Sequence, residues 1–283
     1  MNYRHGFHAG NVADVLKHTV LILLLEALKR KDKPFLVLDT HAGRGLYDLH
    51  SKTGRETGEW QQGIALLQDW PDAPIGVRDL QQLMLRLNKD RGQTDWRYYP
   101  GSPEIIARLL RPVDRAVCCE LQSDEAKALQ LVLEGRRRIS VRNEDGYHAL
   151  RAQLPPVEKR GLVLIDPPYE NEADSWSAIV RALQEGYQRF ATGTFALWYP
   201  IKAKIDARKL HEKMQRTGIR KIWYSELTVF NDVANVGLNG SGMLIINPPF
   251  QVPEQVDQML LPLWKKMSPQ QQGYCESGWL VGE

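Results

Sequence analysis

The sequence predicts an α/β protein in which a mostly parallel sheet of seven strands carries helices on both faces, the doubly wound arrangement. Three observations support this fold class. Short apolar runs of strand length alternate with longer segments of helical periodicity. Acidic residues follow several of the runs, namely Asp39, Glu120, Asp145 and Asp166. The composition, 43% hydrophobic and 25% charged, is that of an ordinary globular protein.

We expect residues 1–283 to form one domain with a small helical insertion at about residues 50–99. In that segment the alternation of strand and helix stops. A turn-rich start leads to predicted helices at residues 59–69 and 77–88, separated by a proline-rich break. About fifty residues are too few to form an independent hydrophobic core, so we interpret the segment as a subdomain and not as a separate domain.

The chain begins with a polar, aromatic and histidine-rich segment, residues 1–10, followed by a predicted helix at residues 11–30. Asn11 is its expected N-cap. Apolar residues recur at helical spacing, which predicts that this helix packs on the sheet. His5, His8 and His18 do not form a close pair at i, i+4, so we expect contacts with substrate or cofactor here and no metal site.

The first predicted strand, residues 35–39, leads into the turn Thr40-His41-Ala42-Gly43-Arg44-Gly45. Glycines at such a turn allow the backbone to approach a ligand closely. After the insertion, Ser102 is a plausible N-cap for a helix at residues 104–110.

A regular alternation follows. Strands are predicted at residues 116–121, 139–143, 162–165 and 194–198, and helices at residues 124–133, 147–153 and 174–190. The last part holds a basic helix at residues 202–216, strands at 221–230 and 241–247, and a helix at 254–266. The two late strands fit an antiparallel hairpin at one edge of the sheet.

The strand at residues 162–165 ends in Asp166-Pro167-Pro168-Tyr169. Ligands bind outside the carboxyl ends of strands in open α/β sheets. A carboxylate and the Pro167 main-chain carbonyl can accept hydrogen bonds from an amino group while an aromatic ring stacks on the heterocycle that bears it. An exocyclic base amine fits that description, although such a tetrapeptide is also an ordinary exit from a strand.

A similar tetrapeptide, Asn247-Pro248-Pro249-Phe250, follows the strand at residues 241–247. In a doubly wound sheet the strand of residues 162–165 borders that of residues 35–39, so Asp166 and the turn at His41 face one crevice. The late hairpin lies elsewhere, and we interpret Asn247 as a structural strand exit.

Two more acids suit a nucleoside ligand. Glu120 ends the second strand, where a carboxylate can accept both ribose hydroxyls. Asp145 follows the third strand, where a carboxylate can accept from an adenine amino group. Together with Asp166 they make three acids in register with a glycine turn. Three such acids are a stronger signal for a ligand site than any one of them.

With these residues identified, the chain resembles the bacterial 23S ribosomal RNA adenine-N6 methyltransferase family of the RlmJ type, whose fold is the class I Rossmann-like methyltransferase fold. The resemblance covers nearly the whole chain and is looser in the insertion and at residues 231–239. It rests on Tyr3-Arg4-His5, Phe7-His8-Ala9-Gly10-Asn11, Ala13-Asp14-Val15-Leu16-Lys17-His18, Asp39-Thr40-His41-Ala42-Gly43, Tyr98-Tyr99-Pro100-Gly101-Ser102-Pro103, Asp166-Pro167-Pro168-Tyr169 and Ala196-Leu197-Trp198-Tyr199-Pro200.

The resemblance implies methyl transfer from S-adenosyl-L-methionine to N6 of one adenosine in 23S ribosomal RNA, with S-adenosyl-L-homocysteine as product. It implies catalytic roles for Asp166, Pro167 and Tyr169 and contacts of Tyr3, His5 and Lys17 with the RNA. The implied cofactor pocket consists of His18, His41, Ser102, Glu120, Asp145, Gly146 and Asp166.

Other amine or amide acceptors stay open, because N6-adenine DNA methyltransferases and glutamine-amide protein methyltransferases use the same kind of loop. A nucleotide-binding protein without catalysis is a third possibility.

The formal charge of +3 permits nucleic acid without demanding it. Three cysteines without zinc spacing indicate a reducing compartment and no metal. With no signal peptide or apolar span evident, we expect a cytoplasmic protein with no membrane contact and no obligate protein partner.

Overall fold

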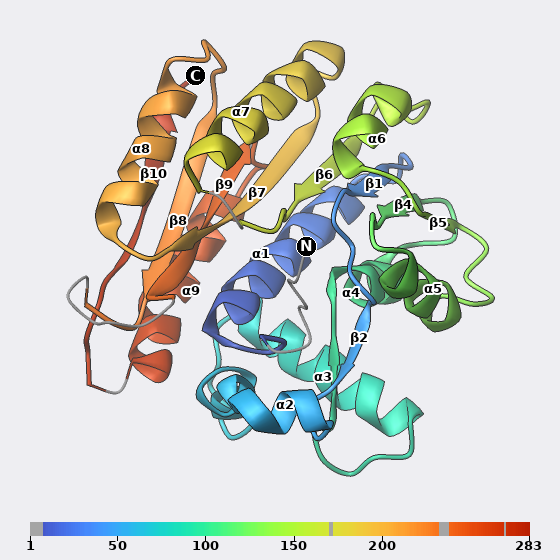
Figure 1. Ribbon diagram of the computed structural model, residues 1–283, viewed down its shortest axis with the longest axis vertical. Coiled ribbons are helices and arrows are strands. Elements are labelled where there is room, and N and C mark those ends of the chain that lie inside the picture. The colour runs from blue at the N-terminus through green and yellow to red at the C-terminus, as the bar shows by residue number, and fades with distance from the viewer. Residues whose placement is uncertain (1–7, 170–171, 232–237, 269) are drawn as a thin grey trace.

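A computed structural model of the chain describes residues 8–169, 172–231, 238–268 and 270–283 (Figure 1). Within them lies a sheet of eight strands in the order β5, β4, β1, β6, β7, β9, β8, β10. The strands are β1 (Leu36–Asp39), β4 (Arg115–Cys119), β5 (Ile139–Arg142), β6 (Gly161–Ile165), β7 (Thr194–Ile201), β8 (Ile222–Thr228), β9 (Gly240–Ile246) and β10 (Cys275–Val281).

The first five strands of that order pair in parallel, and β7, β9, β8 and β10 pair in antiparallel fashion. β6 lies directly beside β1, with Leu36 opposite Gly161, as the sequence predicted. The strand after β5 in the chain, β6, therefore lies on the other side of β1 from β4. The carboxyl ends of β1 and β6 meet at this switch point of the topology.

Strand β10 was not predicted, so the expected count of seven strands was wrong. It pairs with β8, which places the hairpin of β8 and β9 inside the sheet and not at its edge. Residues of β10 are partly or largely exposed, and the segment contains Ser277 and Gly278. An exposed edge strand buries too little apolar surface to leave a clear alternating pattern.

Both faces of the sheet are covered by helices, as Figure 1 shows. Val37 and Leu162 pack in one core with α1 (Val12–Lys29), α4 (Ser102–Leu109), α5 (Ser123–Val132) and α9 (Val252–Met267). Leu38 and Val163 point the other way and pack with α6 (Gly146–Gln153), α7 (Glu172–Arg189) and α8 (Lys204–Gln215). Neighbouring strand residues thus serve opposite cores, because side chains alternate across a strand.

Helix α1 is buried on nearly all sides and packs on the sheet, as expected. Asn11 is its N-cap: the Asn11 side chain accepts a hydrogen bond from the Asp14 N–H at 3.0 Å. The burial of this helix brings even Asp14, Lys17 and His18 into the interior. None of the helices in the described ranges is both long and apolar enough to cross a bilayer.

The insertion between β1 and α4 is less helical than predicted. It holds β2 (Leu46–Asp48), α2 (Lys52–Thr57), η2 (Glu59–Gln62), η3 (Ile64–Leu67), α3 (Val77–Asp90) and β3 (Tyr98–Pro100). β2 and β3 form a two-stranded antiparallel sheet. The helix expected at residues 59–69 is two 3₁₀ turns broken at Gly63, where a Cβ would lie 2.0 Å from the Gly10 carbonyl oxygen. This close contact fixes the insertion against the start of α1.

Candidate active site

A cavity of about 310 Å³ lies at the carboxyl ends of the parallel strands. All seven residues predicted for the cofactor pocket line it: His18, His41, Ser102, Glu120, Asp145, Gly146 and Asp166. They come from α1, α4, α6 and the ends of three strands, so the fold brings together residues far apart in the sequence. The volume is at the lower end of the range for small-molecule sites.

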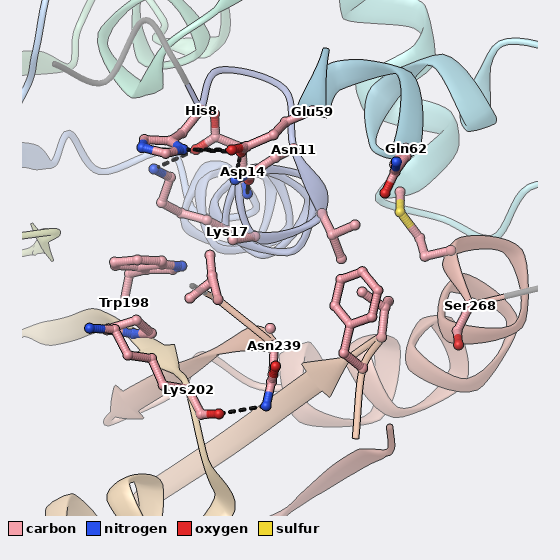
Figure 2. Close-up of a pocket in the computed structure, with 18 of the residues that line it drawn as sticks. His8, Asn11, Asp14, Lys17, Glu59, Gln62, Trp198, Lys202, Asn239 and Ser268 are labelled. Carbon is pink, nitrogen blue, oxygen red and sulfur yellow. Dashed lines mark hydrogen bonds and ion pairs between the residues drawn. The ribbon is translucent and has the colours of Figure 1, made fainter. Parts of the chain in front are cut away.

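A second, larger cavity of about 800 Å³, shown in Figure 2, is also lined by the Asp-Pro-Pro segment. Tyr169 and Trp198 line it beside the start of α1. The two cavities share Lys17, Asp166, Pro167 and Pro168 as lining residues. The predicted catalytic loop therefore lines both cavities.

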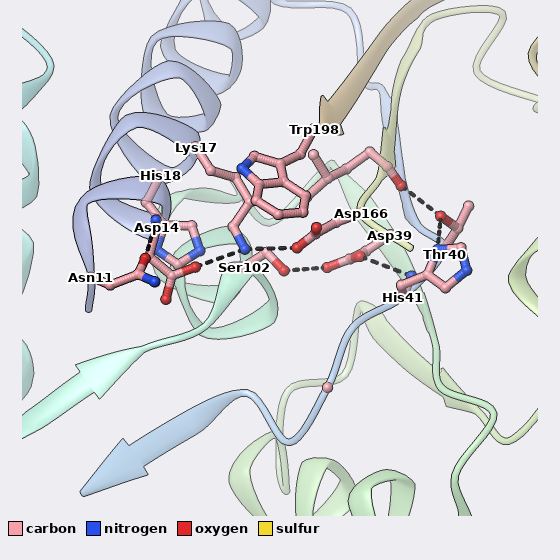
Figure 3. A network of polar contacts seen from close by, with 12 residues as sticks. Asn11, Asp14, Lys17, His18, Asp39, Thr40, His41, Ser102, Asp166 and Trp198 are labelled. Carbon is pink, nitrogen blue, oxygen red and sulfur yellow. Dashed lines mark hydrogen bonds and ion pairs between the residues drawn. The ribbon is translucent and has the colours of Figure 1, made fainter. Parts of the chain in front are cut away.

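Asp166 and Asp14 hold the ammonium group of Lys17 between them (Figure 3). Lys17 Nζ lies 2.6 Å from Asp166 Oδ2 and 2.8 Å from Asp14 Oδ1, and its side chain is 4% exposed. Burial by itself would lower the pKa of this lysine, but the two carboxylates raise it above its ordinary value. Lys17 is therefore a permanent cation that fixes one oxygen of Asp166 and leaves the other available.

Asp39 is a buried carboxyl beside the same site. Ser102 Oγ donates a hydrogen bond of 2.7 Å to Asp39 Oδ2, which Figure 3 shows next to Asp166. The expected N-cap role of Ser102 was wrong, because α4 begins at Ser102 and its N-cap is Gly101. Burial raises the pKa of Asp39 to about 7, and the negative charge of Asp166 adds to the rise.

We predict that Asp39→Asn makes the protein more stable than wild type, by a margin that grows as the pH rises from about 4 to 7. In that window an unfolded Asp39 is ionised while the folded one keeps its proton, so wild type loses up to ~1.4 kcal/mol per pH unit that the amide does not lose. Urea unfolding at several pH values measures the margin.

Asp48→Asn is the matched control. Burial by itself would raise the pKa of Asp48, but the hydrogen bond from Arg97 lowers it below its ordinary value. The stability that ionised Asp48 contributes is therefore constant above the unfolded pKa near 4 and is lost only at lower pH. A margin for Asp39→Asn that stayed flat between pH 4 and 7 would contradict the assignment of a raised pKa.

Glu120 follows β4 and braces the glycine turn. Its Oε2 accepts from the Gly43 N–H at 2.9 Å and its Oε1 from the Gln122 N–H at 2.7 Å. Burial raises the pKa of this carboxyl, and backbone donors at Gln122, Gly43 and Leu121 oppose the rise. Gly43 has a φ of +62°, and a Cβ there would lie 2.7 Å from the Tyr47 hydroxyl, so the turn requires glycine. A carboxylate has about four lone-pair sites, so Glu120 can accept from a further donor.

His41, Asp145 and Gly146 also line the smaller cavity. Burial lowers the pKa of His41 to about 4, so this imidazole is neutral at physiological pH, and its ring contacts Tyr147 edge-on at 5.2 Å. Asp145 caps α6 by accepting from the Tyr147 N–H at 2.8 Å. A Cβ on Gly146 would lie 2.0 Å from the Thr40 carbonyl oxygen, which explains why glycine follows Asp145.

Tyr169 lies on the side of the larger cavity. Its hydroxyl donates to the Trp198 carbonyl, and its ring packs against those of Trp176 and Trp198 at 5.0 and 5.6 Å. Lys17 lies over the Trp198 ring at 5.6 Å. The Trp198 indole N–H is buried and has no hydrogen-bond partner in the described part of the chain.

The sequence interpretation missed Asp14, Asp39, Tyr147 and Trp198 as members of the site. Asp14 is three residues before Lys17, a spacing that places them on one helix face, and this was the available signal. His18 was predicted, and its Nδ1 lies 2.7 Å from the Tyr99 hydroxyl. Tyr3 and His5 lie outside the described residues.

The interpretation of Asn247 as a structural residue is confirmed. β7 is parallel to β6, and β9 runs antiparallel to β7. The carboxyl end of β9 therefore lies beside the amino ends of those strands, away from Asp166. The Asn247 side-chain amide donates to the carbonyls of Ala191 and Gly193 at 2.8 and 2.9 Å. These bonds tie the strand end to the loop before β7.

Comparison with known proteins decides the family. A family model described as "Ribosomal RNA large subunit methyltransferase D, RlmJ" matches residues 32–281. The chain belongs to this family. Proteins named "Ribosomal RNA large subunit methyltransferase J" from Escherichia coli strain K12 and Haemophilus influenzae strain Rd are 44% and 43% identical to it over the full length of both chains.

A crystal structure of a Legionella pneumophila protein is similar to this RlmJ family member with a TM-score of 0.87 and 35% identity, covering 96% of this chain and 98% of the other. The expected Rossmann-like methyltransferase fold is thus confirmed, and the RlmJ family member is a methyltransferase.

Proposed function

We propose that this enzyme transfers a methyl group from S-adenosyl-L-methionine to N6 of a specific adenosine in 23S ribosomal RNA. The observation that carries the proposal is that Asp166, Pro167 and Pro168 line both a cavity suited to a nucleoside cofactor and a larger one suited to a base. The RlmJ family and the names of its relatives support ribosomal RNA as the acceptor. An enzyme with that acceptor works in the cytoplasm.

The residues of the smaller cavity fit the proposed cofactor. Glu120 lines this cavity and its carboxylate is an acceptor, which suits ribose hydroxyls. Asp145 can accept from an adenine amino group, and the neutral His41 ring beside Tyr147 offers apolar contact for the purine. When bound, S-adenosyl-L-methionine supplies a methyl group on a positively charged sulfur and leaves as S-adenosyl-L-homocysteine.

Asp166 and the Pro167 carbonyl are the proposed acceptors for the two hydrogens of the adenine amino group. That amine is a poor nucleophile because its lone pair is delocalised into the ring. Two acceptors favour a pyramidal nitrogen and stabilise the positive charge that develops on it. Lys17 holds Asp166 Oδ2, so Oδ1 is the oxygen that faces the substrate in this proposal. After methyl transfer Asp166 can take the proton.

Aromatic side chains are the proposed holders of the flipped-out base. Tyr169 is fixed by its hydroxyl bond and by Trp176, so its ring is preorganised for stacking. The buried Trp198 N–H can donate to a ring nitrogen of adenine, which carries acceptors beside its amino group. We also propose, from the family resemblance, that Tyr3 and His5 contact the RNA.

A panel of acceptors tests the proposal. Labelled S-adenosyl-L-methionine is offered with 23S ribosomal RNA, duplex DNA containing adenine, and a protein acceptor with an exposed glutamine, followed by mapping of the modified position. We expect label only in the RNA, at N6 of one adenosine. Label in DNA or protein, or binding without transfer, would favour one of the alternatives.

Glu120→Ala is expected to weaken S-adenosyl-L-methionine binding by roughly 1.5–3 kcal/mol, the range for hydrogen bonds to a charged group. Isothermal titration calorimetry on folded protein measures the change. Glu185→Ala is the control, because Glu185 pairs with Arg151 outside both cavities. Equal affinity of the Glu120 variant and wild type would remove Glu120 from the pocket.

A further inference from the structure

The larger cavity has more room than one flipped-out base needs. Its volume of about 800 Å³ lies in the range that accommodates drug-sized ligands, which are larger than a purine. Asp166, Tyr169 and Trp198 line it together with Val229, Phe230 and Asn239. The space therefore extends from the catalytic loop to Phe230, just after β8, and Asn239, just before β9.

The lining changes in chemistry along the cavity. In Figure 2, His8, Glu59, Lys17 and Lys202 lie on one side, and Gln62 and Ser268 lie on the other. Apart from His8, Asp14, Lys17, Glu59, Asp166 and Lys202, the described residues that line the cavity are apolar or carry neutral amides and hydroxyls. Such a lining suits a nucleobase, which is flat, uncharged and rimmed with hydrogen-bonding groups.

Asn239 provides a second, independent observation. It is 1% exposed, and its Nδ2 donates to the carbonyl oxygens of Lys202 and Asn231. Those two acceptors fix the orientation of the amide, since the flipped amide would place Oδ1 against two other oxygens. Oδ1 is buried without a hydrogen-bond partner among the described residues, and Figure 2 shows it turned away from Lys202 toward the α1 side of the cavity.

A buried acceptor without a donor is costly unless a ligand satisfies it. We infer that this part of the cavity is a subsite for a second nucleobase, that of the nucleotide next to the target adenosine, which stacks on Phe230 and donates an N–H to Asn239 Oδ1. The inference rests on the proposed function and extends it: the enzyme takes two adjacent bases out of the RNA stack. Covalent connection to the target delivers the neighbour to the adjoining space.

The test uses a 23S ribosomal RNA fragment that the wild-type enzyme methylates, with one neighbour of the target replaced in turn. An abasic residue at one of the two neighbouring positions should raise KM about tenfold, the scale of one lost base stack. Purine riboside keeps the ring but has no N–H donor on it, and should raise KM about fivefold.

Protein variants complete the test. Phe230→Leu should raise KM about tenfold on the intact RNA and add nothing on the abasic RNA, because both changes remove the same contact. Phe250→Leu is the matched control, since Phe250 is 81% exposed and its carbonyl contacts Arg30 at the far end of α1. S-adenosyl-L-methionine affinity should be the same in all three proteins.

Two results would overturn the inference while leaving the proposed function intact: equal KM for intact RNA and both abasic RNAs, or effects of Phe230→Leu and the abasic residue that multiply. Absence of methylation of any RNA by the wild-type enzyme would instead contradict the proposed function. Because Asn239 also ties down two carbonyls, its oxygen is tested from the RNA side, by purine riboside.

Discussion

Asp166→Ala is expected to lower kcat for methylation of 23S ribosomal RNA by ~10³-fold or more, the scale on which loss of a preorganised electrostatic contact slows an enzyme. The variant loses the acceptor that stabilises charge on the attacking nitrogen. The fold should survive, because Lys17 keeps its ion pair of 2.8 Å with Asp14. Single-turnover methyl transfer with saturating cofactor measures the effect on the chemical step.

Asn247→Ala is the internal control from the other tetrapeptide of this type. Asn247 has a φ of +50° and ties two carbonyls, so alanine there should reduce stability by about 1–3 kcal/mol without changing turnover per folded molecule. If the Asn247 variant were the inactive one, with both proteins folded, the placement of the catalytic loop at β6 would be wrong.

The sequence predicted the parallel half of the sheet well for a physical reason. Strands buried on both faces must be continuously apolar, so residues 162–165 stand out, and the strand order then places Asp166 beside the turn at His41. β10, β2 and β3 depend on pairing partners distant in the chain and are partly exposed, so no local pattern indicated them.

The candidate site was predictable where a residue type follows a strand end, as with Glu120 and Asp145. It was not predictable where function depends on burial. Asp39 was expected only as the end of a strand, yet burial beside Asp166 raises its pKa to about 7. The orphaned groups of Trp198 and Asn239 likewise become visible only when the hydrogen bonds of every neighbour have been assigned.

Lys17→Met is expected to destabilise the fold by ~3–5 kcal/mol, the cost of removing one partner from a buried ion pair. Asp14 and Asp166, whose side chains are 3% and 15% exposed, would then face each other without the cation between them. Urea unfolding followed by circular dichroism measures the loss.

The double variant Asp14→Asn with Lys17→Met should recover most of that stability. It removes one of the two unneutralised charges, and an asparagine oxygen can still accept from the Gly10 N–H, which now donates to Asp14 at 2.9 Å. The double variant therefore keeps one carboxylate without a cation, Asp166, whose side chain is 15% exposed, whereas the single variant Lys17→Met keeps two. Methyl transfer should stay low in the recovered protein, since no cation orients Asp166. A double variant as unstable as the sum of the two single ones would show that Lys17 stabilises the fold through its packing against Trp198 and not through the two carboxylates.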